Sequence, residues 1–311
     1  MVEFYSNRPM EMTNSFQKTI GGDVFNLLSM AQRLGSKTGF VTKLGDDNFS
    51  KFLKQSFLDR NIDITSVISC HGYTGLYFVV LQNHGQREFT YYRSQSAASK
   101  LSKEDLDLRY LCDTKVLHSS GITQAISKPS CQAVAKAFHA GKSNGVTISY
   151  DPNIRSQLCS LQTAKGNFLN IAPYIDILLP GQQELCLLMG TDSLPKAINK
   201  VIKLGIDTIA IKKGKNGCQL IHKNESTSYS AMTKISIKDT TGAGDTFNGA
   251  FLHGIAVGMA PRDAAQLAII ASGLQCRKRG AVDSQPSKHE VFSYYSTTQT
   301  LIKDTTSRKQ I

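Results

Sequence analysis

The sequence predicts an α/β fold with a mainly parallel central sheet flanked by helices. From Lys115 onward, short apolar segments alternate with longer segments whose apolar residues recur at helical spacing. Such alternation is typical of parallel strands joined through helices. The chain has 311 residues, 41% of them hydrophobic, which is enough for one large domain with a sizeable core. We therefore expect a single domain over residues 1–295.

The N-terminal part begins with Met1 to Phe4, which has the character of a strand end. A helix is expected after the turn at Gly21-Gly22, and Gly35 closes it. A short strand from Thr38 to Leu44 follows, and then a helix from Asp46 to Arg60.

Residues 70–98 interrupt the alternation of strands and helices. Gly75–Leu81 and Arg87–Arg93 carry apolar residues at every second position and flank Asn83-His84-Gly85, a candidate hairpin turn. We expect a small separate β-sheet here.

The elements expected after this sheet follow from the periodicity of the apolar residues. The predicted strands are 115–119, 146–151, 175–179, 208–212 and 217–221, and the predicted helices are near 128–142, 161–173, 182–189, 194–204, 243–257 and 261–277. Residues 296–311 are polar and rich in Thr and Lys, so we expect a flexible tail.

Composition argues against several classes of function. The net charge of +12 is spread along the chain without a basic block, and Trp is absent, so we do not expect nucleic-acid binding. No apolar run reaches membrane-spanning length, and the N-terminus lacks a secretory pattern, so we expect no membrane partner. The seven cysteines form no CxxC pair and resemble reduced thiols, which favours a cytoplasmic protein.

The stretch from Asp239 to Phe251 combines small residues, an acid and the start of a helix. Gly242, Ala243 and Gly244 let a ligand approach the backbone amides, and a helix N-terminus attracts anions. Asp245 falls in the first helical turn, where its charged carboxylate can accept a proton. This arrangement suits transfer of a phosphoryl group to a hydroxyl. A glycine-rich turn with a capping Asp explains the spacing alone equally well.

Other candidates follow turns or predicted strand ends. Asn26 lies one helical turn after Gly22 and can offer its amide to a hydroxyl, although an ordinary capped turn also explains it. The segments Asp151–Arg155 and Lys212–Gly214 fall at the carboxyl ends of predicted strands, where α/β sheets bind ligands.

Two of these segments resemble the signatures of one family. Asp-Thr-Thr-Gly-Ala-Gly-Asp-Thr-Phe-x-x-Ala-Phe at residues 239–251 resembles the second signature of the ribokinase-like (PfkB) carbohydrate kinases. Gly-Gly-x-x-x-Asn at residues 21–26 resembles their sugar-side signature. The resemblance implies a ribokinase-like fold, a lid formed by the small β-sheet at residues 70–98, and ATP and Mg²⁺ as cofactors. It also implies that Asp245 is the catalytic base and that the amides of Gly242, Ala243 and Gly244 form an anion hole.

Within the family, Thr74–Tyr77, Tyr91–Arg93 and Asp151–Arg155 most resemble the 2-keto-3-deoxygluconate (2-dehydro-3-deoxygluconate) kinases. This resemblance implies phosphorylation of that sugar acid to its 6-phosphate. A carboxylate needs a cationic partner, and Arg offers a planar fork for it. A neutral sugar such as fructose would leave Arg93 without an anionic partner. The residues implied to bind the sugar are Gly22, Asn26, Tyr77, Tyr91, Arg93, Arg155 and Asp245.

On the nucleotide side, Lys212–Gly217 resembles the family's turn beneath ATP, although it also fits a hairpin loop without a role. The residues implied to contact ATP are Asn153, Lys212, Gly214, Gly217, Gly242 and Gly244. The family's Asn-x-x-Glu element reads Gly181-Gln182-Gln183-Glu184 here, so only the Glu is kept. Because Mg²⁺ is carried mainly by phosphates, we expect no direct metal ligand, and Glu184 to act through water.

Several alternatives stay open. The chain is also compatible with another PfkB sugar kinase, of the fructokinase or ribokinase type, or with an inactive sugar-binding relative. Asp245 and the intact Gly-Ala-Gly argue against loss of catalysis. The segment Tyr91, Tyr92 and Arg93 also fits an ordinary strand with cross-strand aromatic packing, and Arg155 fits a surface salt bridge. A homo-oligomer is compatible with the sequence.

Overall fold

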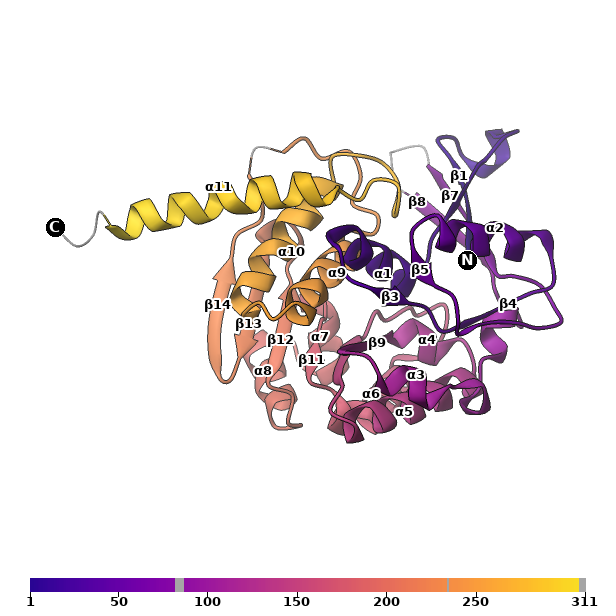
Figure 1. Cartoon of the computed structure of the whole chain (residues 1–311), viewed down its shortest axis with the longest axis horizontal. Coiled ribbons are helices and arrows are strands. Elements are labelled where there is room, and N and C mark those ends of the chain that lie inside the picture. Colours follow the sequence, from indigo (N-terminus) through magenta and orange to yellow (C-terminus); the bar gives the residue numbers. More distant parts are fainter. Residues whose placement is uncertain (82–86, 234, 308–311) are drawn as a thin grey trace. The chain divides into compact units, whose positions relative to one another are not determined.

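The computed structural model describes residues 1–81, 87–233 and 235–307 (Figure 1). The chain divides into two compact units, each built from separate stretches. The first comprises Met1–Phe25, Lys37–Ile148 and Ile154–Tyr174, and the second comprises Asn26–Ser36, Ser149–Asn153 and Ile175–Ile311. The sequence predicts one domain over residues 1–295. The sequence gives no sign of the division where the chain passes between units inside a regular element, as it does in α1 (Asp23–Leu34) and β10 (Thr147–Asp151).

A four-stranded sheet forms part of the first unit. Its strand order is β2-β1-β7-β8, in which β1 runs parallel to β7 and the other neighbours are antiparallel. The strands are β1 (Val2–Ser6), β2 (Gln17–Ile20), β7 (Leu76–Leu81) and β8 (Arg87–Tyr92). The two strands predicted within residues 70–98 are confirmed, but their sheet also contains β1 and β2 from the start of the chain. The predicted turn at residues 83–85 lies outside the described residues.

The prediction of one strand from Thr38 to Leu44 is wrong, because the structure has two short strands there. The first, β3, pairs in parallel with β5, and the second, β4, pairs in parallel with β6. The strand is interrupted at Phe40-Val41, because the residues before this point pair with β5 and those after it pair with β6. These strands are β3 (Thr38–Gly39), β4 (Thr42–Leu44), β5 (Ile62–Asp63) and β6 (Val67–Ser69).

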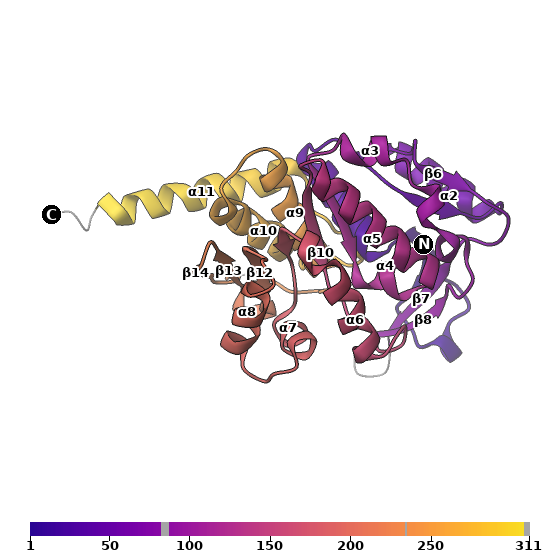
Figure 2. The ribbon, with the colours of Figure 1, turned by 90° about the horizontal axis from the view of Figure 1, so that it is seen from below.

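Helices make up most of the remaining first unit. The predicted helix after Asp46 is α2 (Asn48–Leu58), and Asp47 caps it by accepting from the Ser50 N–H at 2.8 Å. Four more helices pack against one another (Figure 2): α3 (Leu108–Cys112), α4 (Gly121–Ala125), α5 (Lys128–Ser143) and α6 (Leu161–Ile171). Strand β9 (Val116–Ser120) lies beside the start of β10, where the Thr147 N–H donates to the Lys115 C=O at 3.1 Å. Short 3-10 turns cover Met10–Met12, Ala97–Lys100, Lys103–Asp105 and Ala172–Tyr174.

The second unit contains the predicted parallel sheet and an antiparallel extension. The end of β10 pairs in parallel with β11, and β11 with β12, whereas β13 and β14 continue the sheet in antiparallel fashion. The bounds are β11 (Ile177–Leu178), β12 (Thr208–Lys212), β13 (Cys218–His222) and β14 (Glu225–Tyr229). The sequence did not predict β14 because its residues Glu-Ser-Thr-Ser-Tyr are mostly polar, as suits an exposed edge strand.

Helices cover both faces of this sheet. Figure 2 shows α9 and α10 on one face of β12–β14 and α7 and α8 on the other. The helices are α7 (Gln182–Met189), α8 (Leu194–Ile202), α9 (Ala243–Ala256), α10 (Pro261–Gln275) and α11 (Lys288–Ser307). Small residues let helix backbones approach closely: a side chain on Gly249 of α9 would collide with the Leu27 C=O of α1. The path of α9 is thereby set against α1.

The C-terminal helix includes part of the segment that was expected to be a flexible tail, and the flexibility of that segment stays a prediction. Residues from 296 on were expected to be flexible, whereas the helix α11 continues as far as Ser307 and extends past α10 (Figure 1). Within the described residues, no helix is long and apolar enough to cross a membrane.

Candidate functional site

The turn before α9 places backbone amides and an acid together. Gly242 is the N-cap of α9 with φ 72°, a left-handed conformation that favours glycine. A Cβ at this position would also lie 3.0 Å from the Gln275 Nε2 and 3.1 Å from Ala281. Asp245 lies in the first turn of α9 and is half-buried. The predicted helix start is therefore confirmed, and the turn needs glycine for two independent reasons.

The three amides predicted to form the anion hole differ in their bonding. The Ala243 N–H donates to the Thr240 C=O at 3.2 Å, because that bond closes the turn. In the part of the chain that the structure describes, the amides of Gly242 and Gly244 donate no hydrogen bond. The expectation of three available amides is corrected to two.

Asn26 lies beside Asp245, although 219 residues separate them in the sequence. The Asn26 Nδ2 donates to the Asp245 Oδ2 at 2.7 Å, and both residues belong to the second unit. Asn26 is 5% exposed, and its Oδ1 has no hydrogen-bond partner among the described residues. Buried polar atoms are normally hydrogen-bonded. The Asn26 Oδ1, which lies next to the Asp245 carboxylate, can therefore accept a hydrogen bond from a hydroxyl group of a ligand.

A second polar cluster surrounds the carboxyl end of β10. Asp151 is 4% exposed, and its Oδ2 accepts from the Lys212 Nζ at 2.6 Å and from the Asn248 Nδ2 at 2.6 Å. The Lys212 Nζ lies 3.8 Å from the point that a Cβ on Gly244 would occupy, so its charge is beside the anion turn. Asn153 follows with φ 37°, and its N–H donates to the Asp151 Oδ1 at 3.2 Å.

Sequence reasoning missed the roles of Asp151 and Asn248 in this cluster. Asp151 was visible as an acid at a strand end, and Asn248 lies three residues after Asp245, on the same helical face. Spacing on α9 was therefore an available signal for Asn248. The partnership with Lys212 joins three distant segments, and no local pattern reveals it.

The remaining nucleotide-side candidates have structural explanations of their own. Gly217 has φ 86°, and a side chain there would collide with the Tyr229 C=O, so the hairpin itself requires glycine. Gly214 opens the 3-10 turn Gly214–Asn216 with φ 55°, and no atom lies within 4 Å of the point where its Cβ would be. The Glu184 Oε2 accepts from the Gly181 N–H at 3.0 Å at the start of α7. Across residues 1–81, 87–233 and 235–307, no three His, Cys, Asp or Glu side chains gather as metal ligands.

The sugar-side candidates other than Asn26 and Asp245 all belong to the first unit: Gly22, Tyr77, Tyr91, Arg93 and Arg155. Tyr77 and Tyr91 are cross-strand partners with ring centroids 5.7 Å apart. The Tyr77 hydroxyl donates to the buried Glu3, and it lies against Gly21, where a side chain would collide with it. The Gly-Gly turn is therefore held against β7, which brings Gly22 to the same part of the unit as the two tyrosines.

Arginine charges from two segments act on Tyr91. Burial raises the pKa of Tyr91, and the positive charges of Arg155 and Arg93 oppose that rise. Burial also lowers the pKa of Arg93, against the effect of the Asp23 carboxylate. The Asp23 carboxylate therefore supplies a negative charge that acts on Arg93, and the binding of a sugar carboxylate by Arg93 stays a prediction.

Known proteins resemble this chain along most of its length. The model of the pfkB family carbohydrate kinases matches residues 2–288. A 2-dehydro-3-deoxygluconokinase from Thermoproteus tenax is 31% identical, covering 91% of this chain and 87% of its own. Fructokinase-1 from Oryza sativa subsp. japonica is also 31% identical, covering 89% and 88%. A structure from Escherichia coli, solved as a candidate ribokinase II with ATP and Mg²⁺, is 25% identical with a TM-score of 0.87, covering 95% of this chain and 96% of that one.

The fold and these likenesses define a ribokinase-like phosphotransferase. More particularly, the chain belongs to the pfkB family of carbohydrate kinases, whose members use ATP. The sequence-based prediction of this family and of its fold is confirmed.

Proposed function

We propose that the protein transfers the γ-phosphoryl group of ATP to the terminal hydroxyl of 2-keto-3-deoxygluconate, giving the 6-phosphate and ADP. The observation that carries this proposal is that the positive charges of Arg93 and Arg155 both oppose the rise in the pKa of Tyr91. The two arginines come from separate segments of the first unit, and the charges of both act on one aromatic side chain. Two guanidinium charges that act on one aromatic side chain suit a sugar that carries a carboxylate.

The second unit supplies the groups for phosphoryl transfer. The sugar hydroxyl oxygen forms a bond to the γ-phosphorus while the bond to the bridging oxygen of ADP breaks, and Asp245 accepts the hydroxyl proton. The Asn26 Nδ2 holds the Asp245 carboxylate, and the Asn26 Oδ1 is available to the hydroxyl that reacts. The amides of Gly242 and Gly244 and the Lys212 ammonium stabilise charge on the transferring group.

The described residues fit a magnesium ion that arrives on the phosphates of ATP. We assign no direct side-chain ligand to this ion, because Mg²⁺ usually keeps several waters and binds through the phosphates of its nucleotide. Glu184, at the start of α7, is the residue assigned to it, through water. When bound, the ion neutralises phosphate charge.

Fructose is the second candidate substrate, for two reasons. A fructokinase is as similar to this chain as a 2-dehydro-3-deoxygluconokinase. The Asp23 carboxylate already supplies a negative charge that acts on Arg93, so Arg93 does not need a charged sugar as its anionic neighbour.

A substrate panel tests the assignment. We expect kcat/KM for 2-keto-3-deoxygluconate to exceed that for fructose and ribose by about two to four orders of magnitude, since each charge-assisted bond contributes roughly 1.5 to 3 kcal/mol. Arg93→Leu should remove most of this preference and leave the KM for ATP nearly unchanged. Arg87→Leu, on the same hairpin, is the matched control. A higher kcat/KM for fructose or ribose overturns the choice of sugar acid, and absence of turnover with every sugar favours an inactive relative.

A further inference from the structure

Gln275, the last residue of α10, is fully buried and bonded to the loop that precedes α9. Its Nε2 donates to the Thr241 C=O at 2.8 Å, to the Ala281 C=O at 3.0 Å and, at the longer distance of 3.4 Å, to the Gly280 C=O. Its Oε1 accepts from the hydroxyl of Thr246, which lies in the first turn of α9. One side-chain amide thus joins the anion turn, the start of α9 and the loop after α10.

Asp239 also joins the loop before α9 to the loop after α10, but it accepts hydrogen bonds where Gln275 donates them. Its Oδ1 accepts from the Thr241 N–H at 2.8 Å and its Oδ2 from the Gly280 N–H at 2.8 Å. Gln275 therefore binds carbonyl oxygens of these loops while Asp239 binds their amides. Both side chains are buried, so each bond lost would leave a polar group without water.

The bond to Thr241 has a geometric consequence for the anion turn. The C=O of Thr241 and the N–H of Gly242 belong to one planar, trans peptide unit, so the two groups point in opposite directions. Holding the oxygen with Gln275 fixes where the N–H points, which is away from the buried amide. The Gly242 N–H is one of the two amides that the turn leaves available.

We propose that Gln275 is a positioning residue that aims the Gly242 N–H at the transferring phosphoryl group by holding the other end of the same peptide unit. The proposal rests on the proposed function for its kinetic effect. An amide suits this position because it donates to carbonyls and accepts from Thr246 at once. A methionine of the same length offers no donor, and a carboxylate would face the carbonyl oxygens and Asp239 as a further negative group.

The test compares Gln275→Met and Gln275→Glu with the same two substitutions at Gln124. Gln124 is a buried glutamine of the first unit whose Nε2 donates to the Asn167 C=O at 3.3 Å, and it has no assigned role in the reaction. Urea unfolding establishes that each variant is folded under assay conditions, and Gln275→Glu preserves the volume of the side chain. We expect both Gln275 variants to lose kcat by about a hundredfold, the cost of misplacing a reacting group, with both KM values within threefold of wild type.

The dependence of kcat on pH distinguishes a role of Gln275 in positioning the Gly242 N–H from a role in stability alone. Protonation of the carboxyl introduced by Gln275→Glu turns an acceptor into an O–H donor, so the ratio of variant to wild-type kcat should rise as pH falls. Asp239 is a charged group bonded to the same two loops. The Gln124 variants should lose stability without a change of kcat. A kcat within threefold of wild type in folded Gln275→Met overturns the proposal.

Hydrogen exchange keeps the inference testable if the proposed function fails. Should the wild type phosphorylate no sugar, the kinase proposal falls, and amide exchange of residues 239–244 then decides the role of Gln275. At least tenfold faster exchange in Gln275→Met, with none in Gln124→Met, supports the inference. Equal exchange in wild type and Gln275→Met overturns it.

Discussion

Asp245 is the residue on which the proposed chemistry depends most directly. Asp245→Asn keeps the shape of the side chain and can still bond to Asn26, but it cannot accept a proton. We expect kcat to fall by about two to four orders of magnitude, while ATP binding measured by calorimetry is retained. Asp239→Asn is not a suitable control, because it disturbs the same turn. A kcat within a few-fold of wild type would show that another group takes the proton.

Lys212 offers a sharper test, because its contribution to the free energy of unfolding and its contribution to kcat can be measured separately. Lys212→Met leaves the Asp151 carboxylate, 4% exposed, without its cation, which typically costs about 3 to 5 kcal/mol. We expect kcat to fall by about a hundredfold as well, since a charge beside the phosphoryl group is lost.

The double variant Lys212→Met with Asp151→Asn distinguishes these effects. It should recover most of the free energy of unfolding in urea but none of the lost kcat. Lys213→Met, on the neighbouring residue, is the control and should change kcat little. Recovery of kcat in the double variant would assign Lys212 a purely structural role.

Sequence reasoning reached the individual candidates but not their partners. The glycines, Asp245 and Asn26 were visible because each lies in a short pattern. The bond between Asn26 and Asp245, and the pairing of Lys212 with Asp151, join positions far apart in the chain, and a single sequence carries no record of such contacts. The use of the Ala243 N–H within its own turn was equally hidden, because it depends on the exact backbone path.

At the scale of elements, the approach of α9 to α1 is the feature that sets Asn26 beside Asp245. Gly249 of α9 lies where any side chain would collide with the Leu27 C=O, one residue after Asn26. Gly249→Ala should therefore push the helices apart, lowering the free energy of unfolding by about 1 to 3 kcal/mol and reducing kcat.

Gly166→Ala in α6 is the matched control for Gly249→Ala. Gly166 also lies in a helix, but no atom is within 4 Å of the point where its Cβ would be. That substitution should raise the free energy of unfolding by roughly 0.5 to 1 kcal/mol, because alanine favours helix over glycine. Urea unfolding and kcat measure both, and equal effects of the two substitutions would contradict the account of helix packing.

Elements with strong periodicity were predicted well, and weakly patterned ones were not. The helices α7 and α9 and the strand β12 match the predicted bounds to within one residue. Strand β14 was missed because its polar side chains do not alternate with apolar ones, and its position is fixed by pairing with β13. The end of α11 was expected to be a tail because residues 296–311 are polar and rich in Thr and Lys.

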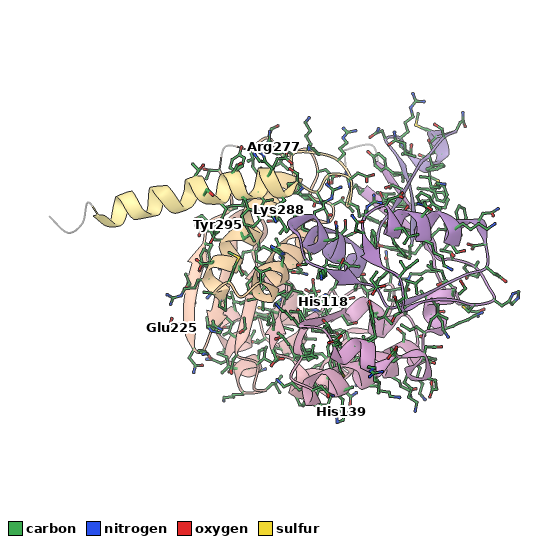
Figure 3. The ribbon with its side chains drawn as sticks, in the orientation of Figure 1. His118, His139, Glu225, Arg277, Lys288 and Tyr295 are labelled. Atoms are coloured by element: carbon green, nitrogen blue, oxygen red, sulfur yellow. The ribbon has the colours of Figure 1, made fainter. Side chains whose placement is uncertain are left out.

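At the scale of the whole molecule, His253 links stability to pH. Burial lowers the pKa of His253, and the positive charge of Lys288 lowers it further. Figure 3 labels Lys288, at the start of α11. The unfolded chain then binds a proton near the ordinary histidine pKa of about 6.5, at a pH where the folded protein does not. The free energy of unfolding should be unaffected by His253 above that pH and should fall as pH drops below it.

Urea unfolding between pH 5 and 8 measures this dependence. His253→Gln keeps a polar partner for Ser36 and should flatten the slope below about pH 6.5. His139→Gln, at an exposed position on α5, should leave the slope as in wild type (Figure 3). Equal slopes in wild type and His253→Gln would exclude this residue as the cause.

The assignment of the candidate groups to two units bears on how a kinase of this kind acquires a new substrate. In the proposed function, the tyrosines and arginines that select the sugar lie in the first unit, and the groups that move the phosphoryl group lie in the second. Mutation of β7, β8 and their flanking residues can therefore change the accepted sugar while the chemistry is inherited intact. Exchange of the β7–β8 hairpin between relatives, by recombination or by protein engineering, could therefore change the sugar specificity with few substitutions elsewhere.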